Sequence, residues 1–188
     1  MIKNLILLFA FVCGFAFCQD DTNLNLSDEA PTGFQSVTTS LDFDDCLTLD
    51  LSTWYNDAHI DFFTQECPAL LGYQVFMIGG DLRSWLVLGR AEERFVFRDD
   101  VWQALGGSFP YVSGSLLEWR FLWADGLTMQ VVAVIYRMAR QDTKTLEDRS
   151  ALVVLRMTEQ SPCFLGLAPN NEEARALADD LTQTCSAE

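Results

Sequence analysis

The first 18 residues decide which cysteines the folded chain can use. Lys3 is followed by an apolar run from Leu5 to Cys18, which is shorter than the ~20 residues that a membrane-spanning helix needs. A positive start, an apolar centre and small residues at the end are typical of a secretion signal. The run therefore predicts a signal peptide over residues 1–18 and a mature chain that begins at Gln19. The alternatives are a retained anchor helix and a lipoprotein acylated at Cys18, which the bulky phenylalanines before it disfavour.

Four cysteines remain once this leader is removed: Cys46, Cys67, Cys163 and Cys185. An even number of cysteines in an exported chain predicts a disulfide framework, and four cysteines allow three pairings. We favour Cys46–Cys67 and Cys163–Cys185, because each closes a short loop and restricts the unfolded chain, which is worth roughly 3 kcal/mol per bond. Free buried thiols are the alternative. A zinc site is disfavoured, since the sequence has no C-x2-C spacing and only His59 would assist the sulfurs.

The acidic charge of the chain limits the partners that it can bind. The sequence has 12 Lys and Arg residues against 27 Asp and Glu residues, a net charge of −15, and loss of Lys3 with the leader gives −15 − 1 = −16. Nucleic acid is not expected as a partner, because phosphates repel such a surface, and the same holds for anionic membranes. A cationic partner and simple solubility are both compatible with this charge. Lys144 is the single lysine of the mature chain, and the prevalence of arginine favours forked pairs with carboxylates over the alternative, an anion-binding cluster.

The mature chain is predicted to be one domain preceded by an acidic tail. Residues 19–33 are polar and lack a hydrophobic period, which predicts a disordered N-terminus, and a single disulfide-bonded domain is expected over residues 34–188. Strands are expected where aliphatic, β-branched and aromatic residues cluster between turn signals: residues 73–78, 84–89, 94–98, 115–123, 128–138, 151–157 and 163–167. The Asp125-Gly126 dipeptide predicts a hairpin between two of these strands.

The clearest helical signal lies near the C-terminus. Asn170 or Asn171 can cap a helix there, and its apolar face is formed by Ala174, Leu177, Ala178 and Leu181. Asp44 to Tyr55 is a second helical candidate, and Asp99-Asp100 is typical of a helix start. Strands that follow one another without regularly alternating helices favour antiparallel pairing. We therefore predict an α+β fold, a curved and mainly antiparallel β-sheet with the C-terminal helix packed on it.

Several short motifs resemble those of a known family. Cys67–Val75 has the sequence C-P-A-L-L-G-Y-Q-V, and Gly80–Arg83 has the sequence G-D-L-R. With Leu117–Arg120 and the late cysteine pair, these motifs resemble a family of uncharacterised exported alphaproteobacterial proteins that carry C-P-G-x-x-G-Y-x-V and then G-D-L-R. The likeness spans most of Leu41 to Cys185, although alanine replaces the family's glycine and residues 91–114 match loosely. The resemblance implies export, one domain and local cysteine pairing, and it transfers no catalytic residue.

No motif for catalysis or metal binding stands out in the sequence. His59 is the only histidine, and no G-x-S-x-G elbow accompanies it. Asp42, Asp44 and Asp45 lack the spacing of an EF-hand loop, so a solvated turn or a helix cap is favoured over a calcium site. The five tryptophans can line a binding face but are expected mainly in the core. We expect no cofactor and no metal.

The candidate binding residues are Asp81, Arg83, Glu118 and Arg120. Asp81 and Arg83 lie two residues apart, so on an extended segment they face the same side and can reach Glu118 or Arg120 on a neighbouring strand. The functional interpretation is a polar recognition site. The structural interpretation, which we favour, is a turn that adjacent glycines permit and Arg–carboxylate pairs lock.

These features favour a periplasmic or secreted protein that binds another molecule over an enzyme. We expect a non-enzymatic domain for an envelope molecule or protein. One specific form is an inhibitor of a cationic secreted enzyme, whose encounter an acidic surface would accelerate. The competing hypothesis is an envelope hydrolase with a pair of carboxylates, which requires a deep pocket that holds two acids. We expect no membrane span after signal cleavage and a monomeric chain.

Overall fold

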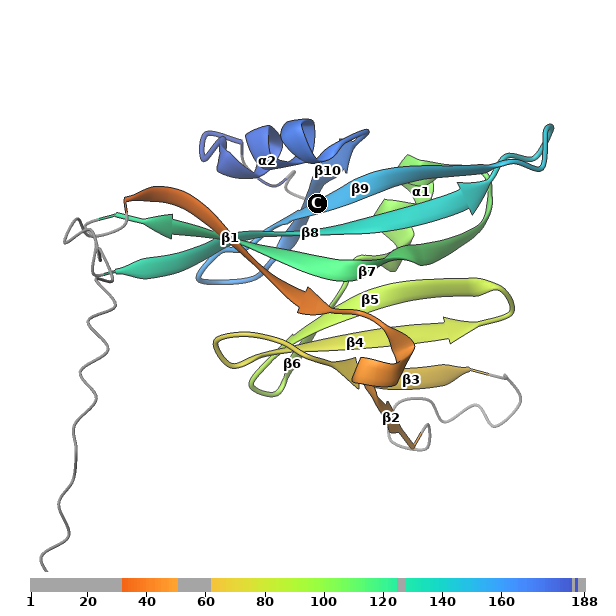
Figure 1. Ribbon diagram of the computed structural model, residues 1–188, viewed down its shortest axis with the longest axis horizontal. Coiled ribbons are helices and arrows are strands. Elements are labelled where there is room, and N and C mark those ends of the chain that lie inside the picture. The colour runs from red at the N-terminus through yellow and green to blue at the C-terminus, as the bar shows by residue number, and fades with distance from the viewer. Residues whose placement is uncertain (1–31, 51–61, 125–127, 184, 186–188) are drawn as a thin grey trace, which may run out of the picture.

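The protein is built from two antiparallel β-sheets (Figure 1). The computed structural model describes residues 32–50, 62–124, 128–183 and 185. Sheet 1 has the order β1-β7-β8-β9-β10, with β1 at Gly33–Ser40, β7 at Ser108–Trp123, β8 at Met129–Gln141, β9 at Asp148–Arg156 and β10 at Cys163–Ala168. Sheet 2 has the order β2-β3-β4-β5-β6, with β2 at Leu47–Leu49, β3 at Phe63–Cys67, β4 at Tyr73–Gly80, β5 at Arg83–Arg90 and β6 at Glu93–Val96. The described helices are the 3-10 helix η1 at Phe43–Asp45, α1 at Arg98–Leu105 and α2 at Asn171–Asp179.

The strands are divided between two sheets, whereas the sequence predicts one. Antiparallel pairing and a C-terminal helix are confirmed. The division follows from β4, which is buried on both faces. Val75 and Met77 pack in the core shared with sheet 1, whereas Phe76 and Ile78 belong to a separate cluster on the outer face. A sheet with two apolar faces needs a layer on each side, and sheet 1 supplies one of them.

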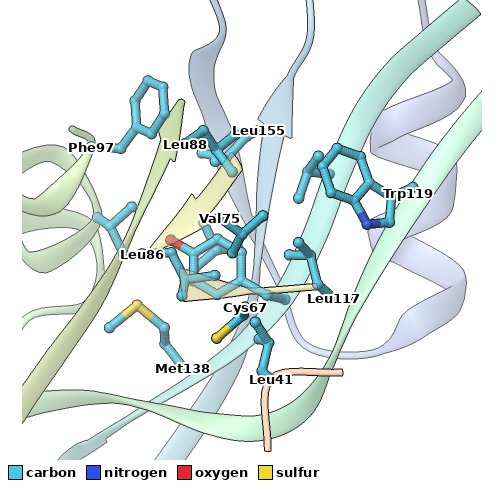
Figure 2. Packing of buried hydrophobic residues seen from close by; sticks show 14 of the residues in the cluster. Leu41, Cys67, Val75, Leu86, Leu88, Phe97, Leu117, Trp119, Met138 and Leu155 are labelled. Carbon is cyan, nitrogen blue, oxygen red and sulfur yellow. The ribbon is translucent and has the colours of Figure 1, made fainter. Parts of the chain in front are cut away.

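The main hydrophobic core lies between the two sheets. Figure 2 shows Leu117 and Trp119 from β7 on one side and Val75, Leu86 and Leu88 from sheet 2 on the other. All five side chains are buried. Burial of a large apolar side chain is worth about 1.5–3 kcal/mol, so this layer is the chief source of stability and fixes how the two sheets sit on each other.

Helix α2 covers the outer face of sheet 1, as the sequence predicts. Its N-cap is Asn170, whose side-chain oxygen accepts a hydrogen bond from the backbone N–H of Glu173 at 2.9 Å. Ala174 and Ala178 are fully buried against residues of β8, β9 and β10. Their small side chains let the helix lie close to the sheet. Leu181, which was expected on the same apolar face, lies beyond the last helical turn and is exposed.

A buried arginine of sheet 1 closes the other end of α2. Arg156 is only 6% exposed, and its guanidinium donates hydrogen bonds to the carbonyl oxygens of Ala178 at 2.7 Å and Asp180 at 2.8 Å. A third, longer bond reaches Leu177 at 3.4 Å. Helix ends leave such carbonyls without intrahelical partners. Burial lowers the pKa of Arg156, but a guanidinium stays charged in proteins, so β9 provides a permanent cap for α2.

The helix expected from Asp44 to Tyr55 is wrong where the structure describes it. Residues 43–45 form only η1, and the following Leu47–Leu49 form strand β2 paired with β3. Cys46 has extended backbone between them and is bonded to Cys67 of β3. The disulfide holds this segment against the sheet edge, which overrides a weak local helical preference. Residues 51–55 lie outside the described residues.

Both predicted disulfides are present. Cys46–Cys67 joins the start of β2 to the end of β3 with a Cα–Cα distance of 4.2 Å. Cys163–Cys185 joins β10 to the segment after α2 with a Cα–Cα distance of 5.9 Å. The second bond therefore fastens α2 at the end that Arg156 also caps.

Removal of either disulfide is expected to lower the free energy of unfolding by about 3 kcal/mol, because each closes a loop of 21 or 22 residues in the unfolded chain. The variants are Cys46→Ala/Cys67→Ala and Cys163→Ala/Cys185→Ala, compared with the oxidised wild type by urea unfolding. If both variants unfold at the wild-type urea concentration, neither bond constrains the unfolded chain.

Candidate functional site

A cavity of about 630 Å3 opens at one end of the molecule, where the β4–β5 hairpin of sheet 2 meets β7, β8 and β9 of sheet 1. The β4–β5 and β8–β9 hairpins leave the two sheets at this same end (Figure 1). The strand register of sheet 1 places Ser108, Gln141 and Asp148 side by side there. The residues that line the cavity are Phe63, Gly80, Asp81, Leu82, Arg83, Ser84, Phe109, Tyr111, Gln141 and Asp148.

A two-residue turn, Asp81-Leu82, forms the tip of the β4–β5 hairpin. Gly80 and Arg83 form the last strand pair before it, and the turn residues have φ values of 51° and 61°. Two left-handed residues define a type I′ turn, which prefers Asn or Asp followed by Gly. Leu82 occupies the position that favours glycine, and it is 79% exposed. A left-handed conformation costs roughly 1–2 kcal/mol for a residue with a Cβ, and so exposed a side chain adds little packing. The stability of the fold therefore does not explain why a leucine occupies position 82.

Arg83 fixes the turn and one wall of the cavity. Its guanidinium lies 2.6 Å from the Asp81 carboxylate and stacks over the Phe109 ring at 4.8 Å. Phe109 has a φ of 50°, which is a strained conformation for a bulky residue. Arg83 and Phe109 also line a second hollow of about 250 Å3 with Trp102 and residues 106–108 and 110. The stacked pair therefore lies between the two hollows.

The opposite wall carries neutral and anionic hydrogen-bonding groups. The Tyr111 hydroxyl donates a hydrogen bond to the Asp148 carboxylate at 3.1 Å. Burial raises the pKa of Tyr111, and the bond and the charge of Asp148 raise it further, so the phenol stays a neutral donor. The Ser84 hydroxyl accepts a hydrogen bond from the backbone N–H of Val112 at 2.8 Å. This bond joins β5 to β7 beside the cavity and holds its two sides together.

Two of the four predicted site residues lie in this cavity. Asp81 and Arg83 line it, whereas Glu118 and Arg120 lie on sheet 1 beneath α2. The expected bond between the two pairs is wrong, because the pairs belong to different sheets and each has other partners. Asp81 also lies in a turn with left-handed backbone, not on an extended segment. It meets Arg83 because the tight turn folds its side chain back.

Glu118 and Arg120 belong to an ion-pair network that fastens α2 to sheet 1. Arg120 is 7% exposed, and its Nε lies 3.0 Å from Oδ1 of Asp179 while a second guanidinium nitrogen bonds to the other carboxylate oxygen. Glu118 accepts a similar forked pair from Arg175 at 2.7 and 3.0 Å. The Ser36 hydroxyl donates to Glu118 and accepts from Arg120. The network links β1, β7 and α2, so these residues serve the fold.

The pKa of Glu118 lies below its ordinary value of 4.5. Burial by itself raises this pKa, but hydrogen bonds from Arg175 and Ser36 and the nearby charges of Arg175 and Arg120 lower it by more. Because the pKa of Glu118 is lower in the folded chain than in the unfolded chain, ionised Glu118 stabilises the fold at pH values above its unfolded-state pKa. This stabilisation is lost as the pH falls through its folded-state pKa.

Glu118→Gln is expected to lower the free energy of unfolding at neutral pH by about 1 kcal/mol. Because the variant has no carboxylate to protonate, its stability should fall less steeply than that of the wild type between about pH 5 and pH 3. Urea unfolding at stepped pH measures both slopes. If the free energy of unfolding falls equally steeply with pH in the variant and the wild type, Glu118 is not the source of this pH dependence.

Sequence reasoning missed Phe63 of sheet 2 and the whole sheet 1 side of the cavity. None of Phe63, Phe109, Tyr111, Gln141 and Asp148 belongs to a recognisable motif. They come from four strands that only tertiary packing brings to one place. Only Asp81 and Arg83 could be identified from the sequence, because the glycines before Asp81 indicate a turn.

The remaining candidates are packing residues or lie outside the described chain. Trp85 and Trp119 are buried, as expected for tryptophans in the core. Trp85 and Trp102 meet edge to face on the outer side of sheet 2, with the Arg98 guanidinium over both rings. His59 lies outside the described residues.

The described residues hold no group of three or more His, Cys, Asp or Glu side chains placed to bind a metal ion. Asp44 and Asp45 occupy the first turn of η1, consistent with the helix-terminal role favoured for this acidic cluster. Within the same part of the chain, every helix is too short or too polar to cross a membrane.

Comparison with known proteins assigns no relative to the chain: no family model matches it, and neither the curated proteins nor the solved structures give a match.

Proposed function

We propose that this chain is an exported, non-enzymatic domain that binds a cationic envelope or extracellular partner in the cavity at the β4–β5 hairpin. The observation that carries the proposal is the cavity. Its volume of about 630 Å3 falls within the range of roughly 300–1,000 Å3 that is typical of ligand pockets. Two disulfides support the periplasmic or secreted location, since such bonds persist in oxidising compartments.

The lining of the cavity suits a group that is both apolar and positively charged. Phe63, Leu82 and Phe109 supply apolar surface. Asp81 and Asp148 supply two carboxylates against the single guanidinium of Arg83, so the net charge of the lining is −2 + 1 = −1. The chain as a whole carries a net charge of −15. Such a field accelerates the approach of a cation, and aromatic walls hold its hydrocarbon part. A lysine or arginine beside an apolar residue on the partner has this chemistry.

The exposed hairpin tip favours a protein as the partner. Leu82 projects from a rigid two-residue turn at the mouth of the cavity, in a backbone conformation that glycine would adopt at lower cost. An exposed leucine there can insert into a surface pocket of a partner. This feature supports the form of the proposal in which the chain inhibits a cationic secreted enzyme.

The hydrolase hypothesis has less support. A carboxyl group that donates a proton near neutral pH needs a buried, apolar setting. Asp81 and Asp148 are both exposed, and each accepts a bond from Arg83 or Tyr111. Exposed carboxylates that accept such bonds suit binding of a cation better than acid catalysis, which requires a buried acid.

Leu82→Gly is expected to separate binding from stability. The variant creates the Asp-Gly turn that type I′ geometry prefers, so the free energy of unfolding should rise by about 1 kcal/mol. Affinity for the partner should fall at least about tenfold, because the projecting side chain is lost. Urea unfolding and surface plasmon resonance measure the two quantities. A gain in stability with unchanged affinity would remove Leu82 from the binding surface.

The proposal is tested by capture from periplasmic extract or culture medium with the immobilised chain at about 0.05 M and about 0.5 M salt. Wild type should retain a cationic partner at low salt and release it at high salt, and Asp81→Asn/Asp148→Asn should retain much less. The matched control is Glu92→Gln/Glu93→Gln, which removes the same charge at the far end of β5 and should bind as wild type does. Equal loss in both double variants would show that net charge, and not the cavity, determines retention.

A further inference from the structure

The edge strands of the two sheets differ in how they are protected. The strand orders place β1 and β10 at the edges of sheet 1, and β2 and β6 at the edges of sheet 2. An edge strand presents unpaired backbone N–H and C=O groups that can pair with a strand of another chain. Proteins prevent this with short strands, charges, prolines or bulges.

Three of these edges carry such protection. Strand β2 has only three residues. Strand β6 has four residues, among them Glu93 and Arg94. Strand β10 contains an irregularity between Phe164 and Gly166, begins directly after a proline and is tied at Cys163 by a disulfide. Pairing along any of them is therefore short or obstructed.

Strand β1 carries no such protection. It has eight residues, G-F-Q-S-V-T-T-S, without a charge or a proline, and it pairs with β7 from end to end with no register shift. Its central residues are exposed, and Val37 shows 47% of its surface. No other strand in the described part of the chain pairs with its free side. An uncharged edge of this length is unexpected in a chain with a net charge of −15.

We propose that β1 is a dimerisation edge, at which two copies of the chain pair β1 with β1 antiparallel about a two-fold axis. The two copies of sheet 1 then form one continuous sheet across the axis. A two-fold axis places the uncharged strand opposite itself, so no like charges meet at the junction although both chains are acidic. Val37, Thr38 and Thr39 supply β-branched side chains for cross-strand pairs.

Strand pairing alone buries little surface, so we expect a weak dimer with a Kd on the order of 10–100 µM. Added salt should strengthen it, because salt screens the repulsion between two acidic chains. That response is opposite to the one expected for the cationic partner. The interface also uses none of the residues that line the cavity. The dimer can therefore be tested independently of the proposed function. It departs from the monomer expected from the sequence.

Sedimentation equilibrium of the purified, oxidised chain tests the proposal with two matched variants. Val37→Glu places a negative charge on β1, and Val96→Glu places the same charge on an exposed valine of edge strand β6. Val37→Glu should weaken the dimer at least about tenfold, whereas Val96→Glu should change it less than about twofold. A chain that stays monomeric up to about 1 mM, or equal weakening by both variants, would overturn the proposal.

Amide hydrogen exchange of the wild type gives a readout that needs no variant. On raising the protein concentration through the Kd, alternate amides of Gly33–Ser40 should gain protection, because only those that point away from β7 become paired across the axis. Concentration-dependent protection at β2, β6 or β10 with none at β1 would place the dimer contact elsewhere and contradict the assignment.

Discussion

Arg156→Met is expected to lower the free energy of unfolding by about 3 kcal/mol and to loosen α2 from sheet 1. Methionine fills similar space but donates no hydrogen bond. The carbonyl oxygens of Ala178 and Asp180 would then lose partners at 2.7 and 2.8 Å. An unsatisfied buried carbonyl costs about 1–3 kcal/mol, and Arg156 is itself almost fully buried. Urea unfolding gives the loss of stability, and amide exchange in Asn171–Asp179 gives the loosening.

Arg137→Met on the neighbouring strand β8 is the matched control. Arg137 is half-buried, and its described hydrogen bond goes to the side chain of Ser150 at 3.2 Å, not to a helix end. Its replacement should cost less than about 1 kcal/mol. Equal losses in the two variants, or unchanged exchange in α2 when Arg156 is replaced, would show that the guanidinium is not the cap of this helix.

Gly79→Ala is expected to lower the free energy of unfolding by about 2–3 kcal/mol and to reduce the cavity. A Cβ at Gly79 would overlap two ring carbons of Phe63 and lie 3.2 Å from the backbone oxygen of Arg83. The backbone cannot retreat within a paired strand, so the Phe63 ring must move. Overpacking of this kind costs typically 1–3 kcal/mol. Because Phe63 lines the cavity, partner binding should fall with stability.

Two further variants show whether the Phe63 ring is the cause. Gly89→Ala is the control on the paired strand β5, where the nearest atom to the added Cβ is the movable guanidinium of Arg94 at 2.9 Å and the Gln74 side chain lies at 3.2 Å, and it should cost less than Gly79→Ala does. Phe63→Leu combined with Gly79→Ala should recover part of the loss, since the smaller side chain leaves room for the Cβ. Strictly additive losses in the double variant would mean that the two positions do not interact.

Most of the long strands and α2 could be predicted from the sequence because each carries its own local signal. Residues 73–78 and 84–89 are apolar runs next to turn glycines, and they became β4 and β5. Asn170 and the spacing of the apolar residues after it marked α2. The hairpin expected around Asp125-Gly126 is confirmed by the pairing of β7 with β8, and its turn residues lie outside the described chain.

Strands β1, β2 and β3 and the division into two sheets could not be predicted, since they depend on residues that are distant in the sequence. Strand β3 contains Thr64 and Gln65, which are polar yet fully buried, so its sequence lacks an apolar alternation. Strand β1 is mostly exposed and equally polar. Which strand joins which sheet is decided by packing between the sheets, and no local pattern encodes it.

Only part of the candidate site could be predicted from the sequence, for a similar reason. The turn signal located Asp81 and Arg83, which line the cavity. Spacing could not show that Glu118 and Arg120 would instead bond to Arg175 and Asp179 of α2. The residues that complete the cavity become neighbours only through the register of β7, β8 and β9.

An amide-exchange footprint shows whether the partner binds in the cavity at the β4–β5 hairpin. Exchange is measured for the chain alone and with the partner that it retains at low salt. We expect new protection in residues 80–84 and at Phe109, Tyr111, Gln141 and Asp148, with Glu93–Val96 at the other end of sheet 2 unchanged. Protection on another surface, with the cavity residues exchanging as they do in the free chain, would contradict binding in the cavity.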